Sequence, residues 1–159
     1  MSVRELRPAD REAVRHMLAD CGAFTDTEVQ VALRMVDDGL NGDYVLPAIE
    51  RCDEVAAFAC IGHAQLTDSA WYVYWICVRR AWQGDGLGRM LQAHIEDIVR
   101  AAGGDRIVLE ASGREDNARV RRFYRAAGFA EVGRIPDFYR PGDDCVVYCK
   151  VLSGEGGSR

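Results

Sequence analysis

The stretch Gln83-Gly84-Asp85-Gly86-Leu87-Gly88 is the most informative part of the chain, because it separates a strand-like segment from a helical one. The preceding segment, 71–78, is rich in aromatic and β-branched residues. From Gly86 onward, apolar residues recur at helical spacing. Glycines let the backbone approach an anion closely, and the first N–H groups of a helix are unpaired donors at the positive end of its dipole. The stretch therefore predicts a strand-to-helix turn that binds a pyrophosphate.

The glycine spacing excludes two common nucleotide-binding motifs. Dinucleotide-binding folds use Gly-x-Gly-x-x-Gly and P-loops use Gly-Lys-Ser/Thr, and the turn at 83–88 has neither. The chain also lacks the alternating parallel βαβ units of a dinucleotide-dependent oxidoreductase. A tight turn that needs glycine only for its geometry is the alternative when this hexapeptide is considered by itself.

The remaining sequence predicts the element order β-α-α-β-β-β-α-β-α-β-β, without repeats or linkers. Strands are expected over 3–7, 43–50, 55–61, 71–78, 107–111, 129–135 and 145–152, and helices from Pro8, Thr25, Gly86 and Asp116 or Asn117, the first ending at Gly22. Residues 1–152 are expected to form one domain, and the Gly/Ser-rich segment 153–159 a flexible tail.

Composition limits the partners and the compartment. A chain of 159 residues with 48% hydrophobic side chains is the size of one globular domain. Its net charge of −5 argues against nucleic acid and anionic membrane surfaces as partners, and is compatible with cationic amine substrates. No apolar run reaches the roughly 18 residues that span a bilayer, and the N-terminal segment is too polar for a signal peptide. We therefore expect a cytoplasmic protein.

The cysteines predict no metal site, because no Cys-x-x-Cys pair occurs. Four of them lie in strand-like apolar runs, where reduced core residues are expected. The six are Cys21, Cys52, Cys60, Cys77, Cys145 and Cys149.

Two motifs, in a fixed order, resemble those of the GNAT superfamily of acyl-CoA N-acyltransferases. Val78 followed by Gln83-x-x-Gly86-x-Gly88 resembles the family's acetyl-CoA pyrophosphate signature, Arg/Gln-x-x-Gly-x-Gly/Ala. Further along, Asn117, Phe123-Tyr124 and Gly128-Phe129 resemble its Asn…Phe-Tyr…Gly-Phe segment. The resemblance covers residues 1–152. Within the family, the chain is similar to the ribosomal-protein N-terminal alanine acetyltransferases. The resemblance implies the GNAT fold, an α/β (α+β) architecture with a mixed central sheet of seven strands, four helices and a strand splay at the acetyl-CoA site.

The resemblance also implies which residues contact acetyl-CoA. A backbone N–H near Cys77 or Val78 would bind the thioester oxygen, although the side chains of that strand belong to the core. Asn117 would bind the pantetheine arm, with a helix cap as the alternative reading. The expected cofactor-binding residues are Ile76, Cys77, Val78, Gln83, Gly84, Asp85, Gly86, Leu87, Gly88, Arg89, Asn117 and Tyr124.

Tyr124 and Glu110 are the expected catalytic residues. Tyr124 matches the family tyrosine, and a phenol with a pKa near 10 stays protonated at neutral pH and can protonate the leaving thiolate; a core aromatic is the alternative. Glu110 is a lone carboxylate in the apolar strand 107–111, where it needs either a partner or the raised pKa of a base. It resembles the glutamate of the alanine acetyltransferases, with a structural ion pair to a neighbouring arginine as the alternative. His63 and ordered water are the other candidate bases.

The helix that carries Tyr124 is also basic. Its run of arginines predicts a solvated face, and contact of one of them, or of Arg89, with a CoA phosphate is the alternative. The run consists of Arg119, Arg121, Arg122 and Arg125.

The loop expected over 136–144 would line the acceptor side. Tyr139 resembles the tyrosine that N-terminal acetyltransferases place over their peptide, and Trp75 and His63 complete the expected substrate-binding set. An α-amine, with its pKa near 8, is easier to deprotonate than a lysine near 10.4, so a peptide N-terminus or a small-molecule amine is preferred.

The predicted function is transfer of an acetyl group from acetyl-CoA to such an amine by direct attack in a ternary complex. A non-catalytic acyl-CoA-binding sensor or scaffold is the alternative, and a homodimer is left open.

Overall fold

The computed structural model describes residues 1–20 and 24–152. Cys21, the helix end expected at Gly22 and the tail expected over 153–159 lie outside the described residues. The chain divides into two compact units, Met1–Gly62 with Val73–Ile95, and His63–Tyr72 with Glu96–Arg159. That residues 1–152 form one domain stays a prediction.

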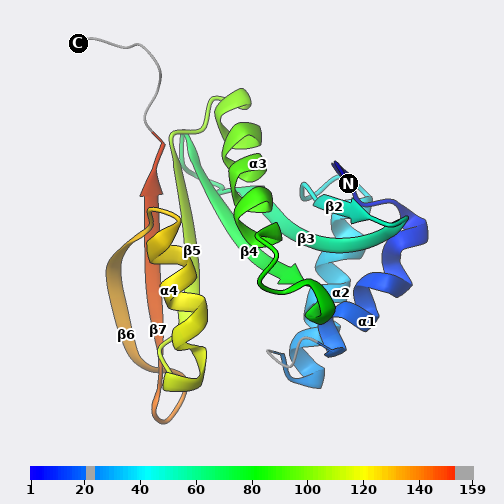
Figure 1. Ribbon diagram of the computed structural model, residues 1–159. Coiled ribbons are helices and arrows are strands. Elements are labelled where there is room, and N and C mark those ends of the chain that lie inside the picture. The colour runs from blue at the N-terminus through cyan, green and yellow to red at the C-terminus, as the bar shows by residue number, and fades with distance from the viewer. Residues whose placement is uncertain (21–23, 153–159) are drawn as a thin grey trace. The chain divides into compact units, whose positions relative to one another are not determined.

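The order of the main helices and strands confirms the sequence prediction (Figure 1). The strands are β1 (Ser2–Glu5), β2 (Pro47–Arg51), β3 (Glu54–His63), β4 (Ala70–Val78), β5 (Arg106–Ser112), β6 (Ala130–Arg140) and β7 (Asp143–Val151). The α-helices are α1 (Arg11–Asp20), α2 (Asp26–Leu40), α3 (Leu87–Ala101) and α4 (Ala118–Ala126), with short 3-10 turns at Pro8–Asp10, Arg80–Trp82 and Glu115–Asn117.

The strands form one mixed sheet in the order β1-β2-β3-β4-β5-β7-β6. Residues Ala70 to Tyr72 of β4 pair in parallel with Arg106 to Val108 of β5, whereas β5 pairs with β7, and β7 with β6, in antiparallel register. The predicted mixed sheet of seven strands with four helices is therefore confirmed. The splay at the acetyl-CoA site stays a prediction.

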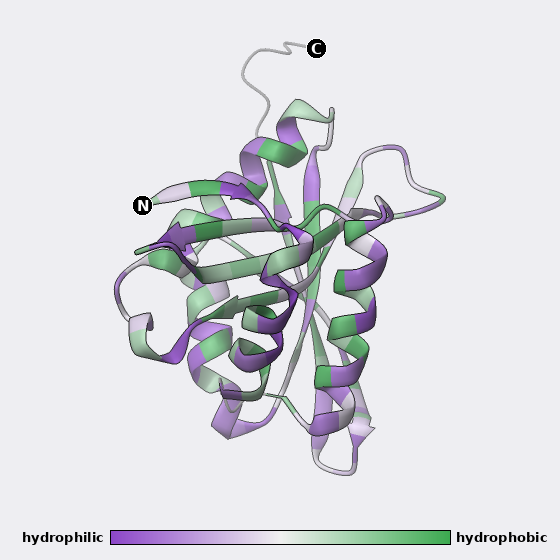
Figure 2. Cartoon of the chain, turned by 90° about the vertical axis from the view of Figure 1, so that its right-hand side faces the viewer, coloured by the Kyte–Doolittle hydropathy of each residue, from purple (hydrophilic) through white to green (hydrophobic). Residues whose placement is uncertain are grey.

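The first unit has a core between α1, α2 and the strands β2 and β3. Thr25 caps α2 as predicted, because its hydroxyl accepts the N–H of Glu28 while the Glu28 carboxylate accepts the N–H of Thr25. Apolar and polar residues alternate along the helices (Figure 2), which lets one face enter the core. The buried cluster contains Leu6, Val14, Met17, Leu18, Val29, Ala32, Leu33, Val36, Leu46, Ala48, Val55, Phe58, Cys60 and Cys77.

The second unit is held partly by an ion pair. Lys150 of β7 donates to Oε1 of Glu96 in α3 at 2.5 Å and to the backbone carbonyl of Ala127, at the end of α4, at 2.7 Å. Gly128 follows with φ +90°, the left-handed conformation that ends a helix, as the sequence predicted.

The largest errors in the predicted elements concern one strand and one loop. The strand expected over 43–50 begins only at Pro47, and Val45 makes an isolated bridge to Ile61. The loop expected over 136–144 is mostly strand, because β6 extends to Arg140 and β7 begins at Asp143. Side chains stabilise this hairpin: Asp144 accepts the N–H of Asp137, and Asp137 accepts the N–H of Gly142.

None of the described cysteines forms a disulfide. Cys60, Cys77 and Cys145 are buried, as expected of core residues, while Cys149 is half-buried and Cys52 is exposed in the β2–β3 turn. Within residues 1–20 and 24–152, no cluster of side chains suits a metal ion, and no helix is long and apolar enough to cross a bilayer.

Candidate functional site

The glycine turn lies in the first unit, between β4 and α3. Gly84 and Gly86 have φ values of +98° and +82°, a backbone conformation that residues with a Cβ rarely adopt. The Gln83 side chain folds back and donates to the carbonyl of Val78 at 3.1 Å, which closes the turn onto the end of β4. The sequence therefore needs glycine at 84 and 86 for backbone geometry, whatever the turn binds.

The start of α3 leaves hydrogen-bond donors unused. The first backbone bond of this region runs from Met90 N–H to the carbonyl of Gly86, at 3.1 Å. Within the described chain, the N–H groups of Leu87, Gly88 and Arg89 donate to no other group, and the first turn of α3 carries no acidic residue. These donors lie at the positive end of a helix dipole and suit an anion.

Two arginines lie beside the turn. The guanidinium groups of Arg51 and Arg79 lie 5.5 and 5.3 Å from the ring centre of Trp82. Arg51 also pairs with Asp85 at 2.6 Å. The expected cofactor contact Asp85 is therefore engaged by a cation, which reduces its repulsion of a phosphate.

The strand before the turn is packed into the first unit. The indole N–H of Trp75 contacts the sulfur of Met35 at 3.1 Å, and its ring meets Phe24 edge-on at 4.9 Å. The buried thiol of Cys77 contacts the carbonyl of Met17 at 3.8 Å. Trp75, expected to contact substrate, thus has its polar atom occupied within the unit. Ile76 and Val78 are half-buried.

A cavity of about 460 Å³ adjoins the end of β4, and the sequence analysis missed it. Its walls come from α1 and from the residues after β4, which are far apart in the sequence, so no local motif indicates it. Its lining residues are His16, Met17, Asp20, Arg79, Arg80 and Ala81.

Tyr124 lies in the second unit and is 8% exposed. Its ring lies 5.3 Å from Phe123, 5.6 Å from Phe129 and 6.2 Å from Tyr148. Burial raises the pKa of the Tyr124 hydroxyl above its usual value, because the charged phenolate is poorly solvated. Tyr124 is therefore packed as a core aromatic and also keeps its proton at neutral pH.

Glu110 and Tyr139 come together in the second unit, around Cys145. The Tyr139 hydroxyl contacts the Cys145 sulfur at 3.7 Å. Burial is the main cause of the raised pKa of both groups, and the Glu110 carboxylate raises them further. Tyr139, expected in a loop, lies in β6.

The apolar surroundings from which a partner was expected for Glu110 are not found. Its strand alternates, with Leu109 and Ala111 buried and Glu110 exposed between them, so the carboxylate is accessible to solvent. The alternative also fails, because within the described residues no ion pair joins Glu110 to an arginine. His63, the other candidate base, is exposed at the end of β3, with its ring 6.1 Å from that of Trp71.

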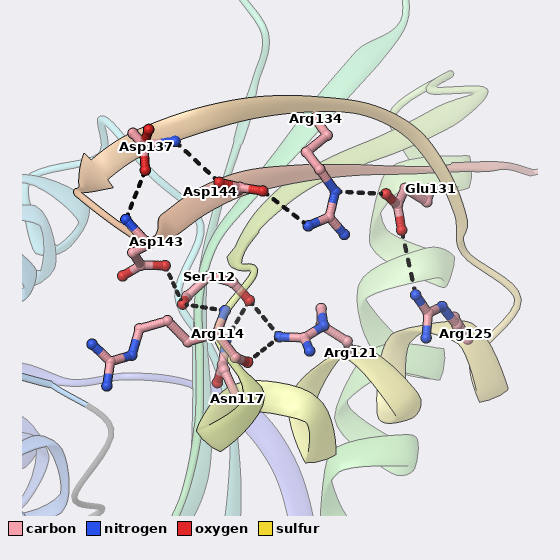
Figure 3. Close-up of polar contacts among 11 residues, drawn as sticks. Ser112, Arg114, Asn117, Arg121, Arg125, Glu131, Arg134, Asp137, Asp143 and Asp144 are labelled. Carbon is pink, nitrogen blue, oxygen red and sulfur yellow. Dashed lines mark hydrogen bonds and ion pairs between the residues drawn. The ribbon is translucent and has the colours of Figure 1, made fainter.

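Asn117 belongs to a polar network at the start of α4 (Figure 3). Asn117 occupies the cap position but makes no side-chain cap; its amide donates instead to the carbonyl of Ser112 at 3.3 Å. Arg121 donates to the same carbonyl at 2.8 Å, and the Ser112 hydroxyl donates to Asp143 at 2.5 Å.

The prediction of a solvated face is therefore wrong for Arg121, which is only 8% exposed. Arg121 is buried because it lies on the same face of α4 as Tyr124. The other three arginines of the run are exposed.

The candidate residues are distributed between both units. The first unit contains Trp75 to Val78 and Gln83 to Arg89, and the second contains His63, Glu110, Asn117, Tyr124 and Tyr139.

Comparison with known proteins identifies the family. The profile of the acetyltransferase (GNAT) family matches residues 11–129, which is more than half of the chain. A protein from Desulfovibrio desulfuricans assigned to the GNAT acetyltransferases is 34% identical, over 96% of this chain and 99% of that chain, with a TM-score of 0.92.

Two further proteins are similar over part of the chain or at lower identity. Mycothiol acetyltransferase of Beutenbergia cavernae is 42% identical over 60 residues, which are 38% of this chain and only 20% of that protein. The ribosomal-protein-S18-alanine N-acetyltransferase of Escherichia coli is 24% identical over 98% of this chain and 96% of that chain, with a TM-score of 0.78, and so shares the fold. On the profile match and the Desulfovibrio relative, the chain belongs to the acetyltransferase (GNAT) family, as the sequence motifs predicted.

Proposed function

We propose that the protein transfers the acetyl group of acetyl-CoA to a primary amine by direct attack in a ternary complex. The observation that carries the proposal is the row of unused N–H donors at the start of α3, behind a glycine turn, in a member of this family. The pyrophosphate of CoA is an anion of the kind such a turn binds. Gln83 to Arg89 would hold it, assisted by the arginines that flank Trp82.

The thioester and the leaving group need different help. A backbone N–H near Cys77 or Val78 would polarise the thioester carbonyl and stabilise the oxyanion that forms on attack. The amine nitrogen forms a bond to the acetyl carbon, the carbon–sulfur bond breaks, and the thiolate takes a proton. Tyr124 would donate that proton, which is consistent with a hydroxyl that burial keeps protonated.

The attacking amine must be neutral. Glu110, directly or through a water molecule, would accept its proton, and its solvent exposure lets protons return to bulk water afterwards. The neighbourhood of Glu110 and Tyr139 supports an acceptor side formed by β5, β6 and β7. His63 and solvent remain the alternative bases.

The proposed acceptor is a peptide N-terminus or a small-molecule amine, because such amines are deprotonated more easily than lysine. One protein of the same fold, the ribosomal-protein-S18-alanine N-acetyltransferase of Escherichia coli, is named for an acceptor of this type.

A screen of thiol release from acetyl-CoA over short peptides, free amino acids, polyamines and aminoglycosides tests the proposal. We expect strong release with one class. Binding of acetyl-CoA without release for any class would support the non-catalytic sensor instead.

A further inference from the structure

Arg121 is buried without a carboxylate of its own. Its Nη1 donates to two backbone carbonyls, Ser112 at 2.8 Å and Arg114 at 2.5 Å, and within the described residues it forms no ion pair (Figure 3). Burying a guanidinium is costly unless its hydrogen bonds are satisfied, so this arrangement needs the two carbonyls to stay in place. Arg121 therefore fixes the linker between β5 and α4.

Ser112 is the centre of the arrangement. Its hydroxyl donates to Asp143, which is 3% exposed, and accepts the N–H of Arg114 at 3.2 Å. Its carbonyl accepts from both Arg121 and Asn117. A buried cation and a buried carboxylate therefore hold the same serine, one through its carbonyl and the other through its hydroxyl.

Asn117 depends on this serine for its orientation. An asparagine amide has two N–H donors and one carbonyl acceptor. The contact of one N–H with Ser112, at 3.3 Å, leaves the second N–H and the carbonyl oxygen for another partner. The position of that amide is thus set by a carbonyl that Arg121 holds with the shorter hydrogen bond.

We propose that Arg121 is a positioning residue, which acts through the Ser112 carbonyl to aim the Asn117 amide at the pantetheine arm of acetyl-CoA. This inference rests on the proposed function, because that function assigns Asn117 to the cofactor. It predicts that the effect of Arg121 on acetyl-CoA passes through Asn117 and not through a phosphate.

The first test needs no ligand. In the full-length chain, NMR of the Asn117 side-chain amide should show an ordered group in the wild type and a mobile one in Arg121→Met. Arg106→Met is the matched control, because Arg106 is an exposed arginine of the same unit, paired with Asp105. Arg121→Lys keeps a cationic donor and should restore part of the order. An Asn117 amide that stays equally ordered in Arg121→Met would overturn the proposal.

The second test separates the arm from the phosphates. Calorimetry with acetyl-CoA should give a Kd about three- to tenfold higher for Arg121→Met, the size of one neutral hydrogen bond. Adenosine 3′,5′-bisphosphate, which lacks pantetheine, should bind the variant and the wild type alike. In an Asn117→Ala background, Arg121→Met should cause no further loss.

Additive losses in the double variant, or equal weakening of the bisphosphate, would show a direct phosphate contact and overturn the proposal. A lower melting temperature with unchanged acetyl-CoA affinity would show a merely structural role and overturn it as well. If the wild type binds no acetyl-CoA, the proposed function fails, and the NMR comparison still decides whether Arg121 orders Asn117.

Discussion

The hydroxyl of Tyr139 in β6 contacts the sulfur of Cys145 in β7 at 3.7 Å, and the carboxylate of Glu110 in β5 helps to raise the pKa of both groups. Three neighbouring strands thus bring together the proposed base and the proposed substrate-contacting tyrosine.

Glu110→Gln should lower kcat/KM near neutral pH and recover partly at high pH, where an α-amine with its pKa near 8 is already neutral. Folding should be unaffected, because Glu110 is exposed and has no ion pair in the described part of the chain. The measurement is a pair of pH–rate profiles with matching melting curves. Glu5→Gln, an exposed glutamate of β1, is the control. An unaltered profile for Glu110→Gln would assign the base to His63 or to solvent.

Gly86→Val should abolish acetyl-CoA binding, because a branched side chain would block the approach of the phosphates to the turn. The substitution also forces φ near +82°, which costs about 1–2 kcal/mol. Gly42→Val controls for that strain, since Gly42 follows the end of α2 and has φ +102° and open space around it. Calorimetry should show lost binding only for Gly86→Val. Unchanged affinity in a folded Gly86→Val would remove the pyrophosphate assignment.

Tyr124→Phe should lower kcat about 10²–10⁴-fold, the usual effect of losing a general acid, with little change in acetyl-CoA affinity. A stability measurement gives a second readout. Because the folded-state pKa of Tyr124 is raised, the wild type loses stability as pH rises above about 10, where the unfolded tyrosine ionises first. The free energy of unfolding of Tyr124→Phe, measured by urea titration, should fall less over that pH range. Wild-type turnover in Tyr124→Phe would leave Tyr124 with only its packing role.

Lys150→Met should lower the free energy of unfolding by about 1–3 kcal/mol, because it leaves Glu96 and the Ala127 carbonyl without their ammonium partner. Arg100→Met is the matched control, since Arg100 pairs with the same Glu96 but its side chain is 43% exposed. The control should lose less than about 1 kcal/mol. An equal decrease in the free energy of unfolding for both variants would mean that burial of the Lys150–Glu96 pair adds nothing to stability.

The fold could be predicted from the sequence because its signals are local. The capping box at Thr25, the glycine turn and the apolar periodicity of the helices each depend on neighbouring residues, and their order matched the family motifs. Errors came where tertiary contacts decide. The hairpin after Ile135 is extended by Asp137 and Asp144 acting across the turn, and neither contact has a sequence signature.

The site was predicted less completely for the same reason. Glu110 is exposed because buried and more exposed residues alternate along its strand. Three consecutive apolar residues, Ile107-Val108-Leu109, hide this alternation in the sequence, since the apolar Val108 takes a half-buried position. Burial of Arg121 follows from its place on the Tyr124 face of α4, but a sequence of four arginines resembles a solvated surface. The hydrogen bond from Ser112 to Asp143 joins residues that are 31 positions apart, and no sequence motif indicates such a contact.

A stoichiometric measurement of acetyl transfer tests direct attack of the amine on acetyl-CoA. Thiol release from acetyl-CoA and acetylated amine, identified by mass spectrometry, are quantified in the same reaction with the best acceptor of the screen. Direct transfer predicts release that depends on the amine, with one acetylated amine for each free CoA and no acetylated enzyme. Release without acetylated amine, or an acetyl group that accumulates on the protein, would contradict direct transfer in a ternary complex.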